Sequence, residues 1–291
     1  MMKKWIIGIL MALFLISMTA CSQKEEVKNK ETKQEVLKIG AIPDQNAADL
    51  NRSMDKVAEY LAKETGMKVE FVPSVDYAAL VTAFERGEIH LAWFGGLTGV
   101  QAHNLVPEAE AIAQRPRDAE FHSVFIAAKD SGITELEDLK GKTFTFGSES
   151  STSGHLMPRF FLNEKGIDPK KDFEGQPNFS GSHDTTYKLV ESGAFQAGAL
   201  NEAVWEAAVA EKKVDTSKVD VFYTTPAYYD YHWMINKIDK DTKSSVKKAL
   251  LEMDSEQKEI LDFFQTDKFI ETKNENYKAI EKVAKELEII K

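Results

Sequence analysis

The chain has 291 residues with 47 acidic and 37 basic side chains, a formal net charge of −10, and one cysteine. A chain this acidic is a poor nucleic-acid binder, because phosphate contacts need clustered lysine and arginine. A lone cysteine excludes an internal disulfide and a multi-cysteine metal cluster.

The first 20 residues are typical of a secretory signal peptide. Lys3 and Lys4 precede an apolar run over 5–16, which is too short for a comfortable transmembrane span, and small residues lead to Cys21. Without residues 1–20, which hold two lysines and no acid, the net charge is −12. The boundary resembles a bacterial lipoprotein signal, which implies that Cys21 is the lipidated first residue of the mature protein. A plain cleaved signal with an incidental cysteine is the alternative.

Residues 21–35 are almost entirely polar and predict a disordered tether between membrane and domain. From residue 36 onward the pattern is α/β. It predicts strands over 36–42, 69–72 and 89–94, a helix through Leu50, Met54, Val57 and Leu61, and a helix over 77–85. Such alternation implies a parallel sheet covered by helices.

After a strand over 121–127 the pattern restarts as a second α/β unit. We predict a short helix over 135–139, helices over 156–165, 184–191 and 201–211, strands over 142–147 and 219–223, a return strand over 228–235, and a charged helical tail over 239–291. These elements predict one lobe from 36–127 and 225–291 and a second lobe from 128–224. Ligands of such sheets lie outside the strand ends, here in the cleft between the lobes.

Four hydroxyl residues, Ser150 to Ser153, stand where a predicted strand turns into a predicted helix. The first N–H groups of a helix have no partner within it, and the helix dipole favours an anion there. A single cap needs only one hydroxyl. The stretch therefore predicts a seat for an oxyanion, with an ordinary helix cap as the alternative.

Several motifs together resemble the phosphonate-binding proteins of ABC transporters. They are Asp76-Tyr77-Ala78, Ala92-Trp93-Phe94-Gly95, Leu139-Lys140-Gly141-Lys142, Ser151-Thr152-Ser153-Gly154 with Pro158, Gly181-Ser182-His183 and the segment 226–233. The resemblance implies a type II periplasmic-binding-protein fold, in which two α/β lobes joined by two crossover strands enclose a ligand cleft.

The resemblance also implies the binding residues. Ser151, Thr152 and Ser153 would hold the oxyanion, with His183, Tyr77 and Asp230 around it. Phe94 stands where the family often has a tyrosine. The acidic residue that grips an aminoalkyl phosphonate would fall near Ala203, which argues against such a ligand. The segments 93–99 and 121–125 are similar to a branch described as binding selenium oxyanions.

These features predict an extracytoplasmic, lipid-anchored, monomeric solute-binding protein for a small tetrahedral oxyanion, without catalysis, cofactor or metal. Its partners would be the oxyanion and an ABC permease with its ATPase. A selenium- or sulfur-oxyanion binder of the same transport class is an alternative. A metal-binding lipoprotein is a second alternative. An exported serine hydrolase is a third, and its nucleophile would be Ser151 or Ser153 activated by His183.

Overall fold

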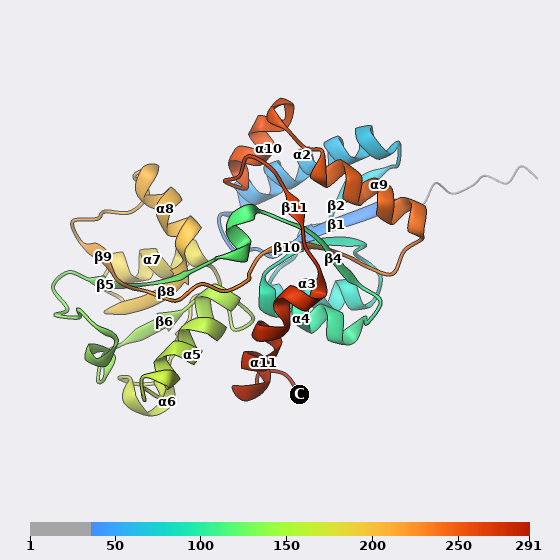
Figure 1. The fold of residues 1–291 in the computed structure, drawn as a ribbon. Helices are drawn as coiled ribbons and strands as arrows, with labels where there is room; N and C mark the ends of the chain where they lie inside the picture. Colours follow the sequence, from blue (N-terminus) through green and yellow to red (C-terminus); the bar gives the residue numbers. More distant parts are fainter. Residues whose placement is uncertain (1–35) are drawn as a thin grey trace, which may run out of the picture. The chain divides into compact units, whose positions relative to one another are not determined.

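The computed structural model describes residues 36–291. The predicted signal peptide, Cys21 and the predicted tether therefore lie outside the described residues. Glu35–Lys291 form one compact unit. This unit contains two β-sheets with helices on both faces, and each sheet is the centre of one lobe (Figure 1).

The first lobe is built on a six-stranded sheet. Across the sheet the strands are β11 (Ile270–Glu271), β4 (Glu110–Gln114), β10 (His232–Ile235), β3 (Leu91–Phe94), β1 (Leu37–Ala41) and β2 (Val69–Phe71). Strands β1, β2 and β3 run parallel, whereas β10 is antiparallel to β3 and β4. The sheet is therefore mixed and not wholly parallel as the alternating pattern suggests, because strands from the C-terminal part of the chain enter it.

Helices cover both faces of the first sheet (Figure 1). One face carries α2 (Ala47–Thr65), α9 (Lys240–Leu251), the 3₁₀ turn η4 (Ser255–Gln257) and α10 (Lys258–Phe263). The other carries α3 (Tyr77–Glu85), α4 (Gly96–Leu105), the 3₁₀ turn η5 (Asn274–Tyr277) and α11 (Lys278–Glu286). The predicted apolar stripe of α2 is buried, as its helical spacing requires.

The second lobe is built on a five-stranded sheet. Its strands are, in order, β7 (Asn178–Phe179), β6 (Phe144–Phe146), β8 (Ala197–Asn201), β5 (Ser123–Ala128) and β9 (Val219–Thr224). The helical segments of this lobe are η2 (Leu136–Leu139), η3 (Thr152–Leu156), α5 (Met157–Glu164), α6 (Pro169–Asp172), α7 (His183–Glu191) and α8 (Glu202–Ala210). Successive residues of β5 enter two different cores, because side chains alternate along a strand: Val124 packs with α7 and α8, and Phe125 packs with α5.

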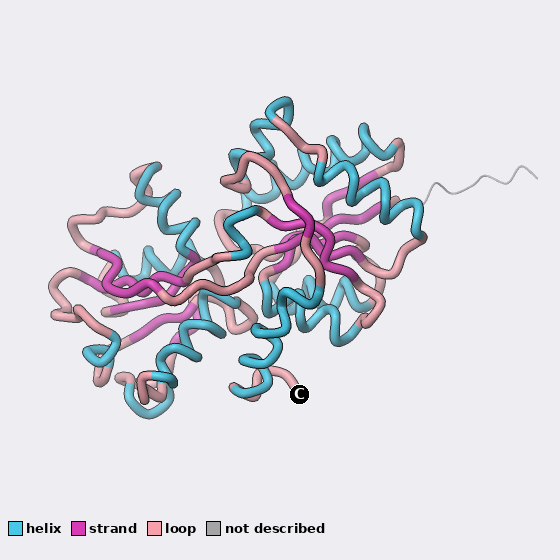
Figure 2. The backbone as a smooth tube through the Cα atoms, viewed as in Figure 1, coloured by secondary structure: helices cyan, strands magenta, loops and turns pink. Residues whose placement is uncertain are grey.

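The chain crosses between the sheets twice. The first crossing, from β4 to β5, contains η1 (Pro116–Ala119), and the second leads from β9 to β10; Figure 2 shows them between the two groups of strands. They lie side by side, because Phe121 and Tyr228 exchange two backbone hydrogen bonds of 2.8 and 3.0 Å. The sequence pattern predicts the boundary between the lobes after residue 127. In the structure, β5 belongs to the second sheet, so the first crossing lies before Ser123.

Three elements near the crossings are not predicted by the sequence pattern: α4, β4 and β8. The predicted return strand is regular only over β10, and the tail over 239–291 includes the short strand β11. Within residues 36–291, no helix has both the length and the apolar character to cross a bilayer.

Candidate ligand-binding site

The hydroxyl stretch opens the helix that follows β6, as predicted. Its first turn is the π-helical turn η3, and Ser151 is the N-cap, whose Oγ accepts from the backbone N–H of Gly154 at 2.9 Å. Ser151, Thr152 and Ser153 are each at most 2 % exposed. Since Ser151 supplies the cap, the other two hydroxyls are left for other partners.

The two lobes meet at the N-terminus of α4. The backbone N–H of Leu97 donates to Thr152 Oγ1 at 2.9 Å, and that of Gly96 donates to Asp230 Oδ1 at 2.8 Å. A Cβ atom on Gly95 would lie 3.2 Å from both of these oxygens, so glycine permits the close approach. This helix start thus holds one oxygen from the second lobe and one carboxylate oxygen from the second crossing.

Among the buried side-chain atoms of residues 36–291 that have no hydrogen-bond partner, three lie beside this junction: Tyr77 OH, Ser153 Oγ and Asp230 Oδ2. Tyr77 is the first residue of α3 in the first lobe, whereas Ser153 belongs to the second lobe. Leaving such a group unpaired costs about 1–3 kcal/mol, so buried polar atoms in folded proteins nearly always have partners. Three of them together indicate a place for a polar ligand.

Burial controls the electrostatics of this site. It raises the pKa of Asp230 to about 7, although the Gly96 N–H and the nearby hydroxyls of Thr152 and Ser153 favour the ionised form. Burial also raises the pKa of Tyr77 well above its usual value, and the charges of Asp44 and Asp230 add to the effect. Tyr77 therefore stays a hydroxyl donor at neutral pH, and Asp230 Oδ2 can accept a proton or share one.

The donor set suits a small oxyanion that carries one proton. Two hydroxyls can donate to oxygens of the ligand, and the free carboxylate oxygen can accept from an O–H group. Within residues 36–291, no group of three or more His, Cys, Asp or Glu side chains is arranged to hold a metal ion.

His183 is the first residue of α7 and is completely buried. Its Nδ1 accepts from the Asn201 N–H at 3.3 Å, and its Nε2 contacts Tyr231 OH at 3.2 Å. Both ring nitrogens thus have protein partners, and neither contacts a serine. The predicted donation from His183 to the ligand stays a prediction, and the Ser–His pair of the hydrolase alternative does not form.

Phe94 ends β3 and is completely buried, with its ring packed edge-on to Phe84 at a centroid distance of 5.3 Å. Its predicted place in the site stays a prediction. Glu202, the acid beside Ala203, lies 3.8 Å from Arg117 in an ion pair between the second lobe and the first crossing.

A family model describing the phosphonate periplasmic substrate-binding proteins of ABC transporters matches residues 39–277. The chain belongs to this family. The predicted resemblance and the two-lobed α/β fold are thereby confirmed, and the protein is a phosphonate-type substrate-binding protein of an ABC transporter.

Two relatives, one of them also with a solved structure, show how similar this chain is to other proteins of this kind. A probable ABC transporter phosphite-binding protein from Prochlorococcus marinus is 42% identical over 270 residues, which are 88% of this chain and 91% of that protein. A structure of a Prochlorococcus marinus protein in complex with methylphosphonate matches with a TM-score of 0.85 and 41% identity, and covers 88% of this chain and 100% of that one. A phosphate-import protein from Mycolicibacterium smegmatis is 33% identical over 195 residues, 63% of this chain and 60% of its own.

Sequence reasoning missed three buried polar residues beside the predicted site: Asp44, Asn201 and Tyr231. Asp44 follows β1 closely, and Asn201 is the last residue of β8. The position of Asp44 and Asn201 could have indicated them, since ligand-site residues of α/β sheets gather after the strand ends, whereas Tyr231 precedes β10 and carries no such signal. Burial raises the pKa of Asp44 to about 6, although the Tyr231 hydroxyl lowers it.

Proposed function

We propose that this family member captures a small, protonatable tetrahedral oxyanion, such as phosphite, methylphosphonate or phosphate, and delivers it to an ABC permease with its ATPase. The observation that carries the proposal is the set of unpaired buried atoms, Tyr77 OH, Ser153 Oγ and Asp230 Oδ2. The relatives are named for phosphite and for phosphate, and one is bound to methylphosphonate, which are all of this chemistry.

The proposed binding site contains Ser151, Thr152, Ser153, Tyr77 and Asp230. Ser153 and Tyr77 donate to the ligand, and Asp230 accepts its proton. Thr152 holds the start of α4 in place by accepting from the Leu97 N–H, and Ser151 caps η3 by accepting from the Gly154 N–H. His183 supports these residues indirectly, through its hydrogen bonds with Asn201 and Tyr231. The protein works as a monomer and leaves its ligand chemically unchanged.

Binding of oxyanions should be visible as thermal stabilisation of Glu35–Lys291, which contains both sheets and their cores. A ligand at a hundred times its Kd stabilises the folded state by about 2.7 kcal/mol. For a chain of this size that raises Tm by roughly 5–10 °C. Phosphite, methylphosphonate, phosphate, sulfate, selenate and zinc would be compared at one ionic strength.

We expect a rise in Tm with phosphite or methylphosphonate and none with zinc. Phosphorus NMR of the same samples should show unchanged ligand after prolonged incubation. A zinc response without any oxyanion response would contradict the proposal in favour of the metal-binding alternative. Release of a new phosphorus species would show catalysis and contradict the absence of enzyme activity.

We further propose that the protein is held on the extracytoplasmic face of the cell membrane by a fatty acid on Cys21. Cys21 is the only cysteine and follows an apolar run with a basic start. In a bacterial host, the wild-type chain should fractionate with membranes, and Cys21→Ser should move it to the soluble or unprocessed pool. Radiolabelled palmitate in the serine variant would exclude Cys21 as the attachment site.

A further inference from the structure

The hydroxyl of Tyr231 joins the two lobes beside the proposed site. Tyr231 lies in the second crossing, directly after Asp230, and is 2 % exposed. Its oxygen accepts from Asn201 Nδ2 at 3.0 Å and lies 3.2 Å from His183 Nε2. Asn201 and His183 both belong to the second lobe, at the end of β8 and the start of α7.

The protons of this cluster follow from its hydrogen bonds. Because His183 Nδ1 accepts from the Asn201 N–H, its Nε2 carries the hydrogen and donates to Tyr231. Burial lowers the pKa of His183 to about 4, so the ring is neutral. The Tyr231 oxygen therefore accepts twice, and its own hydrogen is left to donate to Asp44 of the first lobe, whose pKa it lowers. The His183 backbone N–H adds a 2.9 Å bond to the Asp44 carbonyl.

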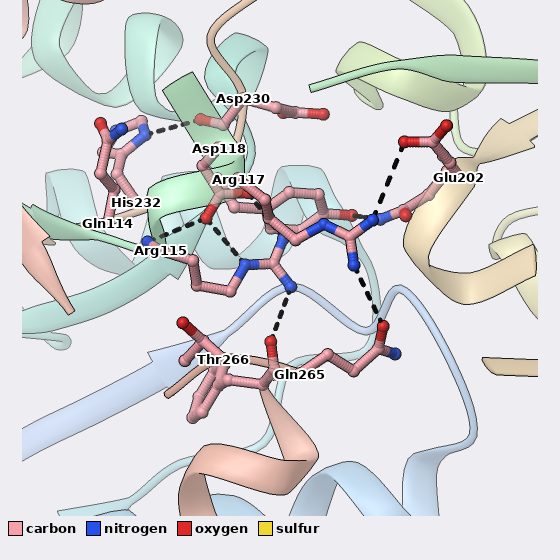
Figure 3. Close-up of polar contacts among 12 residues, drawn as sticks. Gln114, Arg115, Arg117, Asp118, Glu202, Asp230, His232, Gln265 and Thr266 are labelled. Carbon is pink, nitrogen blue, oxygen red and sulfur yellow. Dashed lines mark hydrogen bonds and ion pairs between the residues drawn. The ribbon is translucent and has the colours of Figure 1, made fainter. Parts of the chain in front are cut away.

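The Tyr231 ring is fixed from the side of the first lobe and the first crossing. It stacks on Trp93 at 5.6 Å, and the guanidinium of Arg115 lies 5.1 Å from its centroid. Arg115 is held in turn by two bonds to Asp118, of 2.6 and 2.7 Å, and by a 3.0 Å bond to the Phe264 carbonyl (Figure 3). These contacts attach the Tyr231 ring to the first lobe and the first crossing, whereas its hydroxyl is bonded to the second lobe.

We infer that Tyr231 is a positioning residue whose hydroxyl holds the lobes together around the bound oxyanion. The inference rests on the proposed function. Opening of the lobes would separate His183 and Asn201 from a hydroxyl that stays with the first lobe. The bonds to Tyr231 thus favour the closed arrangement, in which Ser153 from one lobe and Tyr77 from the other can reach the same ligand.

The test compares Tyr231→Phe with wild type and with Tyr60→Phe. Tyr60 donates to the Ala249 carbonyl at 2.7 Å between α2 and α9, so the control loses a tyrosine hydrogen bond inside one lobe. We expect Tyr231→Phe to weaken methylphosphonate binding about five- to a hundredfold, mainly through faster dissociation in stopped-flow measurements. Tyr60→Phe should bind as wild type does.

A second readout follows the lobes themselves. Glu35–Lys291 contain no cysteine, so cysteines introduced at the exposed Glu59 and Glu164 would place one spin label on each lobe. In the ligand-free state, Tyr231→Phe should give longer or more widely spread distances than wild type. Asn201→Ser, which keeps a capping residue for α8 but cannot reach Tyr231, should act in the same direction.

The outcomes separate the inference from the proposed function. Wild-type dissociation rates and distances in Tyr231→Phe and Asn201→Ser would overturn the inference. So would weaker binding with unchanged distances, because Tyr231 would then act only at the ligand. Altered distances in a protein that binds no oxyanion even as wild type would support the role of Tyr231 in holding the lobes and contradict the proposed function.

Discussion

Ser153→Ala is expected to weaken methylphosphonate binding about ten- to a hundredfold. The Ser153 hydroxyl is buried and has no hydrogen-bond partner within residues 36–291, so it is available to donate to a charged oxygen. Loss of a hydrogen bond to a charged group costs about 1.5–3 kcal/mol, and each 1.4 kcal/mol is a factor of ten in Kd. The helix start should survive, because Ser151 remains its cap. Titration calorimetry with Glu35–Lys291 measures the loss.

The stability of the free protein distinguishes this role from a structural one. Removal of an unpaired buried hydroxyl should leave the ligand-free protein as stable as wild type or slightly more stable. Thr152→Ala should instead destabilise it, because Thr152 Oγ1 accepts from the Leu97 N–H and the variant loses this bond. The exposed Ser192→Ala serves as a neutral control. Equal affinity of wild type and Ser153→Ala would remove Ser153 from the site.

Asp230→Asn is expected to reduce the discrimination between protonatable and fully ionised oxyanions at least tenfold at pH 8. Because burial raises the pKa of Asp230 to about 7, its carboxyl group is mainly ionised at that pH. An ionised Oδ2 can accept the proton of a phosphonate, but it repels sulfate or selenate, which have no proton to give. The amide of asparagine can donate to either anion. Wild type should therefore bind phosphonate and reject sulfate, whereas the variant should bind phosphonate more weakly and sulfate more tightly.

The same carboxyl group predicts how selectivity depends on pH. Below about pH 7 Asp230 is protonated and can itself donate to a fully ionised anion, so sulfate should bind wild type better at pH 6 than at pH 8. Asp230→Asn should lack this dependence. Competition titrations at both pH values and one ionic strength provide the measurement. Tight selenate or sulfate binding by wild type at pH 8 would favour the selenium-oxyanion alternative.

Strands and helices with clear periodicity could be predicted closely, whereas those without it could not. Helix α2 presents apolar residues at helical spacing and ends at Gly66, which adopts the left-handed conformation with φ of 68°. Helix α4 escapes prediction because two glycines, Gly96 and Gly99, lie in its first turn and its apolar residues form no single stripe. The end of the first crossing could not be predicted either, because no turn residue separates the apolar Phe121 from β5.

The sequence predicts the local features of the candidate site and not those that depend on tertiary contacts. The hydroxyls at 151–153 are adjacent in sequence, so their position at a helix start could be predicted. Thr152 Oγ1 accepts from the Leu97 N–H, whereas Ser153 Oγ has no such partner. This difference depends on how the second lobe packs against α4. The partners of His183 likewise come from residues far away in the sequence.

The position of β10 between β3 and β4 dictates an order of folding. The second sheet is made from one continuous stretch, 123–224, whereas the first sheet needs strands from both sides of that stretch. Whenever the chain emerges with its N-terminus first, the strands of the second lobe are complete before β10 emerges. Until then β4 has no strand that connects it to β1, β2 and β3. Strand β10 can pair with β3 and β4 only after a loop of roughly a hundred residues has closed. Completion of this sheet is a late, long-range step, of the kind that slows the folding of a chain.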